Sequence, residues 1–168
     1  MHVTTVVLAL TLHAAEGSER HVRSVEPRLV ALVERGLSRS ETFRRIVATL
    51  EQSDVFVLIE SKVIPQRFKG YLLHHVVTAG NRRYLRIVVG ATGRDDDLVR
   101  VIAHELQHAC EVAQAPHVRD EAAMDALFGR IGLCPGCVIP VQETSGAQRI
   151  EELVGRELKA HSGSHQHR

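Results

Sequence analysis

The spacing of apolar residues changes several times along the chain, and each change predicts a different element. Apolar residues three and four positions apart are typical of helices that bury one face. This spacing predicts five helices, over 27–36, 38–50, 98–113, a segment from Met124 to Ile131, and a last helix that starts near Glu143 or Thr144. Short β-branched and aromatic runs predict strands over 55–59, 71–77 and 84–89.

Polar residues and glycines mark where these elements begin and end. Gly36 is expected to stop the first helix, and Ser38 with Glu41 forms a capping box for the second. Residues 78–81 (Thr-Ala-Gly-Asn) have the composition of a tight turn, so the two strands around them are expected to pair antiparallel. Asp95–Asp97 place carboxylates at the positive end of the helix that follows.

The order of these elements predicts a single α+β domain over residues 16–160, because the sequence shows neither an internal repeat nor a linker. We expect a small mixed or antiparallel sheet of about three to four strands, packed on helix 98–113 and flanked by N-terminal and C-terminal helices. Arg83 shares a strand face with Leu85 and Ile87, and one face of that strand is expected to be wetter than the other.

The two ends of the chain are expected to lie outside this domain. An apolar run over 6–12, followed by two alanines, is typical of a signal peptide over residues 1–15 and predicts an exported protein, periplasmic or secreted. No Lys or Arg precedes that run, and the alternative is a first β-strand. Residues 161–168 hold three histidines among small polar residues and are predicted to be a disordered tail.

The composition narrows the possible function classes. Apolar residues make up 44% of the 168 residues and charged residues 24%, which excludes wholesale disorder. A formal net charge of +1 lacks the basic excess of a nucleic-acid-binding protein. No later apolar run is long enough to span a bilayer. The unusual number is 11 histidines, beside two tyrosines and no tryptophan.

Two of these histidines have the spacing at which two side chains of one helix can bind the same metal ion. The sequence His104-Glu-Leu-Gln-His108 is an H-E-x-x-H motif inside helix 98–113. Residues four apart share a helix face, about 6 Å apart along the axis, so both imidazoles can bind one Zn²⁺. Glu105 projects beside them, where it can act as a general base toward a water that the metal activates. The simpler alternative is a pair of solvated surface histidines.

The motif resembles the active-site helix of zincin metallopeptidases, in which a small mixed sheet precedes the helix and its edge strand aligns an extended substrate. Strand 84–89, directly before the helix, is similar to that arrangement. The longer string Ala103–Glu111 also resembles small uncharacterised bacterial proteins of presumed export, a likeness that implies no activity. The zincin resemblance implies a zinc-dependent peptidase that acts on a peptide or protein substrate.

A catalytic zinc usually has three protein ligands. The metzincin continuation of the motif is absent, because Glu111 stands at its glycine position and His117 lies nine residues after His108 instead of six. Glu143, followed by small residues, is similar to the glutamate that gluzincins supply from a later helix, although Gln148 stands close by where an acidic residue often follows. Glu143 is the first candidate; the alternatives left open are Asp120, Glu121, Asp125, Glu111 and His117.

Glu111 lies about 10 Å along the axis from His104, which suits support of a histidine better than direct metal binding. A donor that stabilises the reacting carbonyl can come from an arginine or from one of four strand residues, and the sequence does not select among them. The four are Tyr71, His74, His75 and Tyr84.

The three cysteines suggest a separate feature. Cys134 and Cys137 lie in a C-x-x-C loop after a helix, where a local disulfide in an exported protein fits better than a thioredoxin-like redox site. Cys110 is expected to be a small buried residue.

These patterns together predict a zinc-dependent peptidase in which His104, His108 and Glu143 bind Zn²⁺ and Glu105 is the general base. One alternative is a non-catalytic exported zinc-binding or interaction domain that retains the motif. Another is a thiol–disulfide protein built on the C-x-x-C loop.

Overall fold

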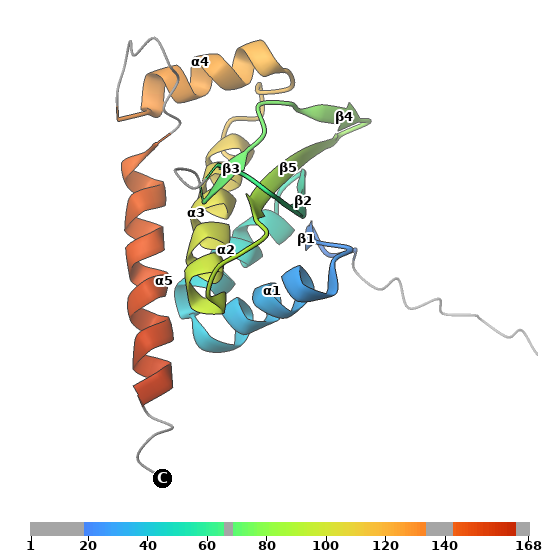
Figure 1. Ribbon diagram of the computed structural model, residues 1–168. Helices are drawn as coiled ribbons and strands as arrows, with labels where there is room; N and C mark the ends of the chain where they lie inside the picture. Colours follow the sequence, from blue (N-terminus) through green and yellow to red (C-terminus); the bar gives the residue numbers. More distant parts are fainter. Residues whose placement is uncertain (1–18, 66–68, 134–142, 164–168) are drawn as a thin grey trace, which may run out of the picture.

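The computed structural model describes residues 19–65, 69–133 and 143–163 (Figure 1). These residues form an α+β fold, as the sequence predicts, with a mixed sheet of five strands instead of three or four. The predicted signal peptide and the C-x-x-C loop lie outside the described residues. The elements in chain order are β1 (Val22–Arg23), α1 (Pro27–Arg39), α2 (Glu41–Glu51), β2 (Val55–Lys62), β3 (Gly70–Leu72), β4 (Val77–Ala79), β5 (Arg82–Gly90), α3 (Asp95–Ala113), α4 (Glu121–Ile131) and α5 (Ser145–Gly163).

The sheet is built around β5. Strands β1, β2 and β5 run parallel, and β3 and β4 each pair antiparallel with β5, so that β3 is the edge strand of the order β1-β2-β5-β3. The predicted turn at 78–81 joins β4 to β5, and Gly80 adopts the positive φ of 58° that such turns require. The strand predicted over 71–77 is two short strands, β3 and β4, because residues 74–76 between them lie outside the sheet.

The core lies between the sheet and α3. Val57 and Ile59 of β2 and Leu85 and Ile87 of β5 are at most 1% exposed and belong to one apolar cluster with the buried side of α3. Helix α5 lies along α3 (Figure 1). None of the helices in the described part of the chain is long and apolar enough to cross a membrane.

The boundary between the first two helices differs from the prediction. Helix α1 continues past Gly36 to Arg39, and α2 is capped by Ser40, whose Oγ accepts a hydrogen bond from the Phe43 N–H at 3.0 Å. The capping box predicted at Ser38 is therefore wrong. Gly36 has a packing role, because a Cβ at this position would lie 2.7 Å from the Phe43 ring.

Helix α5 begins as expected and ends later than expected. Thr144 caps it, with its Oγ1 accepting a hydrogen bond from the Ala147 N–H at 3.1 Å. The helix extends to Gly163, so residues 161–163 are helical although the sequence places them in a tail. Residues 164–168 lie outside the described part of the chain.

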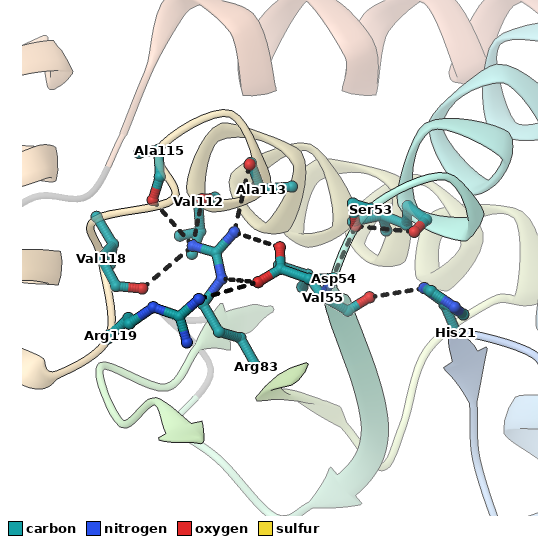
Figure 2. Close-up of polar contacts among 11 residues, drawn as sticks. His21, Ser53, Asp54, Val55, Arg83, Val112, Ala113, Ala115, Val118 and Arg119 are labelled. Atoms are coloured by element: carbon teal, nitrogen blue, oxygen red, sulfur yellow. Dashed lines mark hydrogen bonds and ion pairs between the residues drawn. The ribbon is translucent and has the colours of Figure 1, made fainter. Parts of the chain in front are cut away.

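Arg83 joins the sheet to the C-terminal end of α3 (Figure 2). Its side chain is fully buried, and its guanidinium donates to both carboxylate oxygens of Asp54, at 2.6 and 2.8 Å. It also donates to the carbonyls of Val112, Ala115 and Val118 at 2.9–3.1 Å. Val112 lies in the last turn of α3, which has no basic residue, and Ala115 and Val118 lie in the segment that follows the helix. Arg83 therefore holds the end of α3 that carries His108.

Candidate metal centre

The two histidines of the H-E-x-x-H motif face each other on α3. His104 Nε2 and His108 Nε2 are 3.2 Å apart, and the two rings meet edge to face. His108 is 2% exposed, and the side chain of His104 is 13% exposed. The pair is therefore a buried feature and not two solvated helix histidines.

Glu143 supplies a third donor atom from outside α3. Its Oε1 lies 3.5 Å from His104 Nε2, is buried, and has no hydrogen-bond partner among the described residues. The main chain at Glu143 is held in place, because its carbonyl accepts a hydrogen bond from the Leu133 N–H at 2.8 Å and the next residue caps α5. A buried carboxylate oxygen without a donor is costly unless a cation balances it.

The spacing of these donors is close to that of a tetrahedral zinc site. Bonds of about 2.0–2.1 Å set the donor atoms about 3.3–3.4 Å apart. The two measured distances, 3.2 Å between the imidazoles and 3.5 Å to the carboxylate, are both within 0.2 Å of that range. No group of three or more His, Cys, Asp or Glu side chains in the described part of the chain is already arranged as a complete metal site. The donors are suitable in type, and the distances from His104 to His108 and from His104 to Glu143 fit a tetrahedral site.

Each histidine has a carboxylate on its other ring nitrogen. Glu111 Oε2 lies 2.9 Å from His108 Nδ1, and Glu151 Oε2 lies 3.3 Å from His104 Nδ1, the latter as an ion-pair contact without hydrogen-bond geometry. A carboxylate at Nδ1 orients the ring and leaves Nε2 free to bind a metal, and this arrangement accompanies most metal-bound histidines. The sequence suggested a supporting role for Glu111, whereas Glu151 was not identified. No local pattern indicates it, because its contact with His104 depends on how α5 packs on α3.

The carboxylates also change the acidity of the first histidine. Burial, the largest single influence, lowers the pKa of His104, but the carboxylates of Glu151, Glu105 and Glu143 together outweigh it and raise the pKa above its usual value. Contact with His104 in turn lowers the pKa of Glu151, against the effect of burial. His104 therefore holds a positive charge more readily than an isolated histidine does.

Close packing of α5 on α3 brings the two sets of residues together. Thr144 Oγ1 donates to Glu111 Oε1 at 2.7 Å, which links the start of α5 to the carboxylate behind His108. A Cβ at Gly146 would lie 2.9 Å from that same Glu111 oxygen, so only glycine fits there without displacing it. The glycine after Glu143 and Thr144 thus permits the close approach of α5 to α3.

Glu105 lies on the sheet side of α3 and is 6% exposed. Burial is the main cause that raises the pKa of this carboxyl, while the neighbouring histidines and the backbone of Leu72 in β3 oppose the shift. A carboxylate with a raised pKa holds a proton more readily, which is useful in a group that must accept one and later release it.

The other candidate ligands do not join this cluster. Asp120 caps α4 by accepting a hydrogen bond from the Ala123 N–H at 2.8 Å, and Glu121 and His117 are exposed. Asp125 contacts His74 Nδ1 instead of either motif histidine. These four residues have structural or surface positions among the described residues.

His74 differs from the other proposed donors. Asp125 contacts its Nδ1, and its Nε2 is buried with no hydrogen-bond partner among the described residues. Its ring stacks on Phe128 at 5.4 Å, and the other motif histidine, His108, meets the same Phe128 ring at 5.4 Å. Tyr84 stacks on Phe56. His74 therefore lies near the candidate site and has an unused ring nitrogen.

Comparison of the chain with protein-family models, with curated proteins and with solved structures found no match.

Proposed function

We propose that the protein is a zinc-dependent peptidase, with Zn²⁺ held by His104, His108 and Glu143 and with Glu105 as the general base. The observation that carries the proposal is that two imidazole Nε2 atoms lie close together and that His104 also meets a buried carboxylate oxygen, which has no hydrogen-bond partner among the described residues. Support comes from the carboxylates on the two Nδ1 atoms, which a purely structural histidine pair does not need.

The chain's own residues have distinct roles in this proposal. Bound Zn²⁺ would polarise the substrate carbonyl and make water nucleophilic near neutral pH. Glu105 would accept the proton of that water and later donate it to the leaving amine, for which its raised pKa is suited. His74, oriented by Asp125, would donate from Nε2 to the carbonyl oxygen as charge develops there, in the form in which both of its ring nitrogens carry a proton.

A peptide substrate is favoured by the position of β3. This strand ends the sheet and pairs only with β5 among the described residues, and its Leu72 backbone faces Glu105. An extended peptide can add to a free strand edge through main-chain hydrogen bonds. The bond to be cleaved would then lie beside the general base.

Metal analysis of the purified protein tests the metal part of the proposal. The wild-type protein should contain about one zinc per chain, and His108→Ala should lose it because two ligands do not hold zinc tightly. His117→Ala, which changes an exposed histidine outside the cluster, is the matched control and should keep its zinc. Full zinc content in His108→Ala would overturn the site.

Hydrolysis of a fluorogenic peptide library tests the catalytic part. Glu105→Gln should keep its zinc and lose cleavage by at least about 100-fold, the lower range for removal of a general base. A wild-type protein that binds zinc and cleaves no peptide would instead support the non-catalytic zinc-binding domain.

A further inference from the structure

The two faces of the sheet differ in what covers them. Val57, Leu85 and Ile87 face the apolar cluster that the sheet shares with α1, α2 and α3. Because side chains alternate along a strand, the residues between them belong to the opposite face, which we call the open face. Its central residues are Arg23, Phe56, Leu58, Arg82, Tyr84 and Arg86. We propose that the open face binds an acidic segment of another polypeptide, an interaction that goes beyond the proposed peptidase and requires neither zinc nor cleavage.

The apolar run in β2 favours a sheet that is covered on both sides. Residues 55–59 are apolar on both faces of the strand, which is typical of strands buried on both sides. Strands β1, β2 and β5 also run parallel, and parallel strands seldom leave one face in water. Here the side chains of Arg23, Arg82 and Arg86 on the open face are 43–52% exposed. The open face therefore suits a binding partner.

Aromatic rings line the middle of the open face, and the central ring is already covered. Phe56 lies between His21 and Tyr84, whose ring centroids are 3.8 and 5.4 Å away, and both neighbours stack on it. The guanidinium of Arg82 lies 4.9 Å from the centroid of the same ring, and Phe56 is 4% exposed. Single-stranded nucleic acids bind open sheets by stacking bases on free aromatic faces. Phe56 has no free face, which favours a polypeptide partner over a nucleic acid.

The charges on the open face and at its rim favour an acidic partner. Four cations stand there against two carboxylates; the cations are Arg23, Lys62, Arg82 and Arg86, and the carboxylates are Glu19 and Glu60. Together they carry a net charge of +2, whereas the whole chain carries +1, so the remainder of the chain is negative. A second copy of the chain would bring the same positive charge to this face, whereas a run of Asp and Glu is attracted to it.

A carboxylate of the chain itself shows how a partner can be held. Glu19 accepts hydrogen bonds from Arg23 at 2.7 Å and from Arg82 at 2.9 Å. The two guanidiniums lie 6.0 and 4.9 Å from the centroid of the Phe56 ring, so they are held side by side over it. Because exposed ion pairs are weak, the carboxylate of a partner can replace Glu19 at little cost.

The other two cations have hydrogen-bond donors available. The carboxylate of Glu60 lies 3.9 Å from Arg86 and 3.6 Å from Lys62, farther than a hydrogen bond. Neither of these basic side chains donates a hydrogen bond to another residue in the described part of the chain. Their N–H groups can therefore bind the carboxylates of an acidic segment.

Fluorescence anisotropy of a labelled peptide of alternating Glu and Ser tests this inference on chelator-treated protein, in which neither zinc nor cleavage contributes. The wild-type protein should bind this peptide, whereas a peptide of alternating Lys and Ser should not bind. Raising the salt concentration from about 0.01 M to about 0.15 M should weaken the binding, because the Debye length shortens from about 30 Å to about 8 Å.

Charge reversal on the open face gives the main comparison. The double variant Arg82→Glu/Arg86→Glu should bind the acidic peptide at least about 10-fold more weakly than the wild type. The control variant Arg149→Glu/Arg156→Glu makes the same change in net charge on the exposed side of α5, and it should retain most of the binding.

A milder double variant keeps the test valid if charge reversal disturbs folding. Lys62→Gln/Arg86→Gln leaves Arg82 over the ring of Phe56 and should weaken binding by roughly 3-fold. Absence of binding by the wild type, unchanged binding in both open-face variants, or an equal loss in the α5 control would overturn the inference. Tighter binding of oligothymidylate than of the acidic peptide would also overturn it, in favour of a nucleic acid. Zinc content and cleavage test the proposed peptidase separately, so the failure of one proposal leaves the other standing.

Discussion

The buried carboxylate of Glu105 should lower the stability of the metal-free protein against unfolding. Its pKa in the folded state is raised by burial, so the folded protein binds the proton more tightly than the unfolded chain does. Stability should therefore fall as the pH rises from the unfolded pKa near 4.5 through the raised folded value. We expect Glu105→Gln to be more stable than the wild type at pH 7, by an amount on the order of 1 kcal/mol, and to lack this pH dependence.

Urea denaturation of chelator-treated protein at pH 5 and pH 7 measures the effect. Glu152→Gln changes an exposed glutamate on α5 and should alter stability little. If Glu105→Gln is no more stable than the wild type at pH 7, the buried carboxylate does not destabilise the metal-free protein.

Residue-level prediction succeeded where a single helix determines the geometry. The spacing of His104 and His108 alone places both rings on one face of α3, and the structure brings their Nε2 atoms within 3.2 Å. Glu151 and the His74–Asp125 pair depend on how separate elements pack, so no local pattern indicates them. Glu143 as a ligand stays a prediction.

At the scale of the element, the contact between Arg83 and Asp54 holds the C-terminal end of α3 against the sheet. Asp54→Asn would remove the carboxylate that pairs with the fully buried guanidinium of Arg83. We expect the free energy of unfolding to fall by roughly 2–3 kcal/mol. This is less than for a fully buried pair, because the Asp54 side chain is 31% exposed. The guanidinium of Arg83 lowers the pKa of Asp54, so this stabilisation is present above the unfolded pKa near 3.8 and is lost as the pH falls through the folded value.

Hydrogen exchange and thermal unfolding measure this contribution. Amides in the last turn of α3 should exchange faster in Asp54→Asn than in the wild type, since their helix end is no longer anchored. Arg119→Ala removes an exposed arginine that lies 3.9 Å from the same carboxylate. This change should lower the free energy of unfolding by at most about 1 kcal/mol. Equal effects of the two changes would contradict an anchoring role for Arg83.

The boundaries of the elements were predictable where local chemistry determines them. The predictions failed where tertiary packing determines the boundary. The turn before β5 follows from Gly80, which few other residues replace at a positive φ. Alternation placed Arg83 on the same strand face as Leu85 and Ile87, but its pairing with Asp54 and with the end of α3 is visible only in three dimensions. The first helix passes Gly36 because that glycine accommodates Phe43 instead of ending the helix.

The candidate site is assembled from three separate parts of the chain. The motif lies on α3, Glu143 lies just before α5, and β3 provides the strand beside Glu105. A metal bound by α3 and Glu143 would act as a cross-link between two helices that already pack together (Figure 1). Because such a site exists only in the folded protein, the free energy of metal binding adds to the free energy of unfolding.

Zinc should therefore raise the thermal stability of the whole molecule. At a free zinc concentration about 100-fold above the dissociation constant, the stabilisation is about 2.7 kcal/mol, which corresponds to an increase in Tm of roughly 5–10 °C for a chain of this size. Differential scanning calorimetry of chelator-treated protein, with and without zinc, measures this increase. Glu143→Gln should lose most of it because an amide oxygen is a weaker ligand than a carboxylate, whereas the exposed-site variant Glu152→Gln should retain it. A full increase in Glu143→Gln would show that the Glu143 carboxylate is not the third ligand.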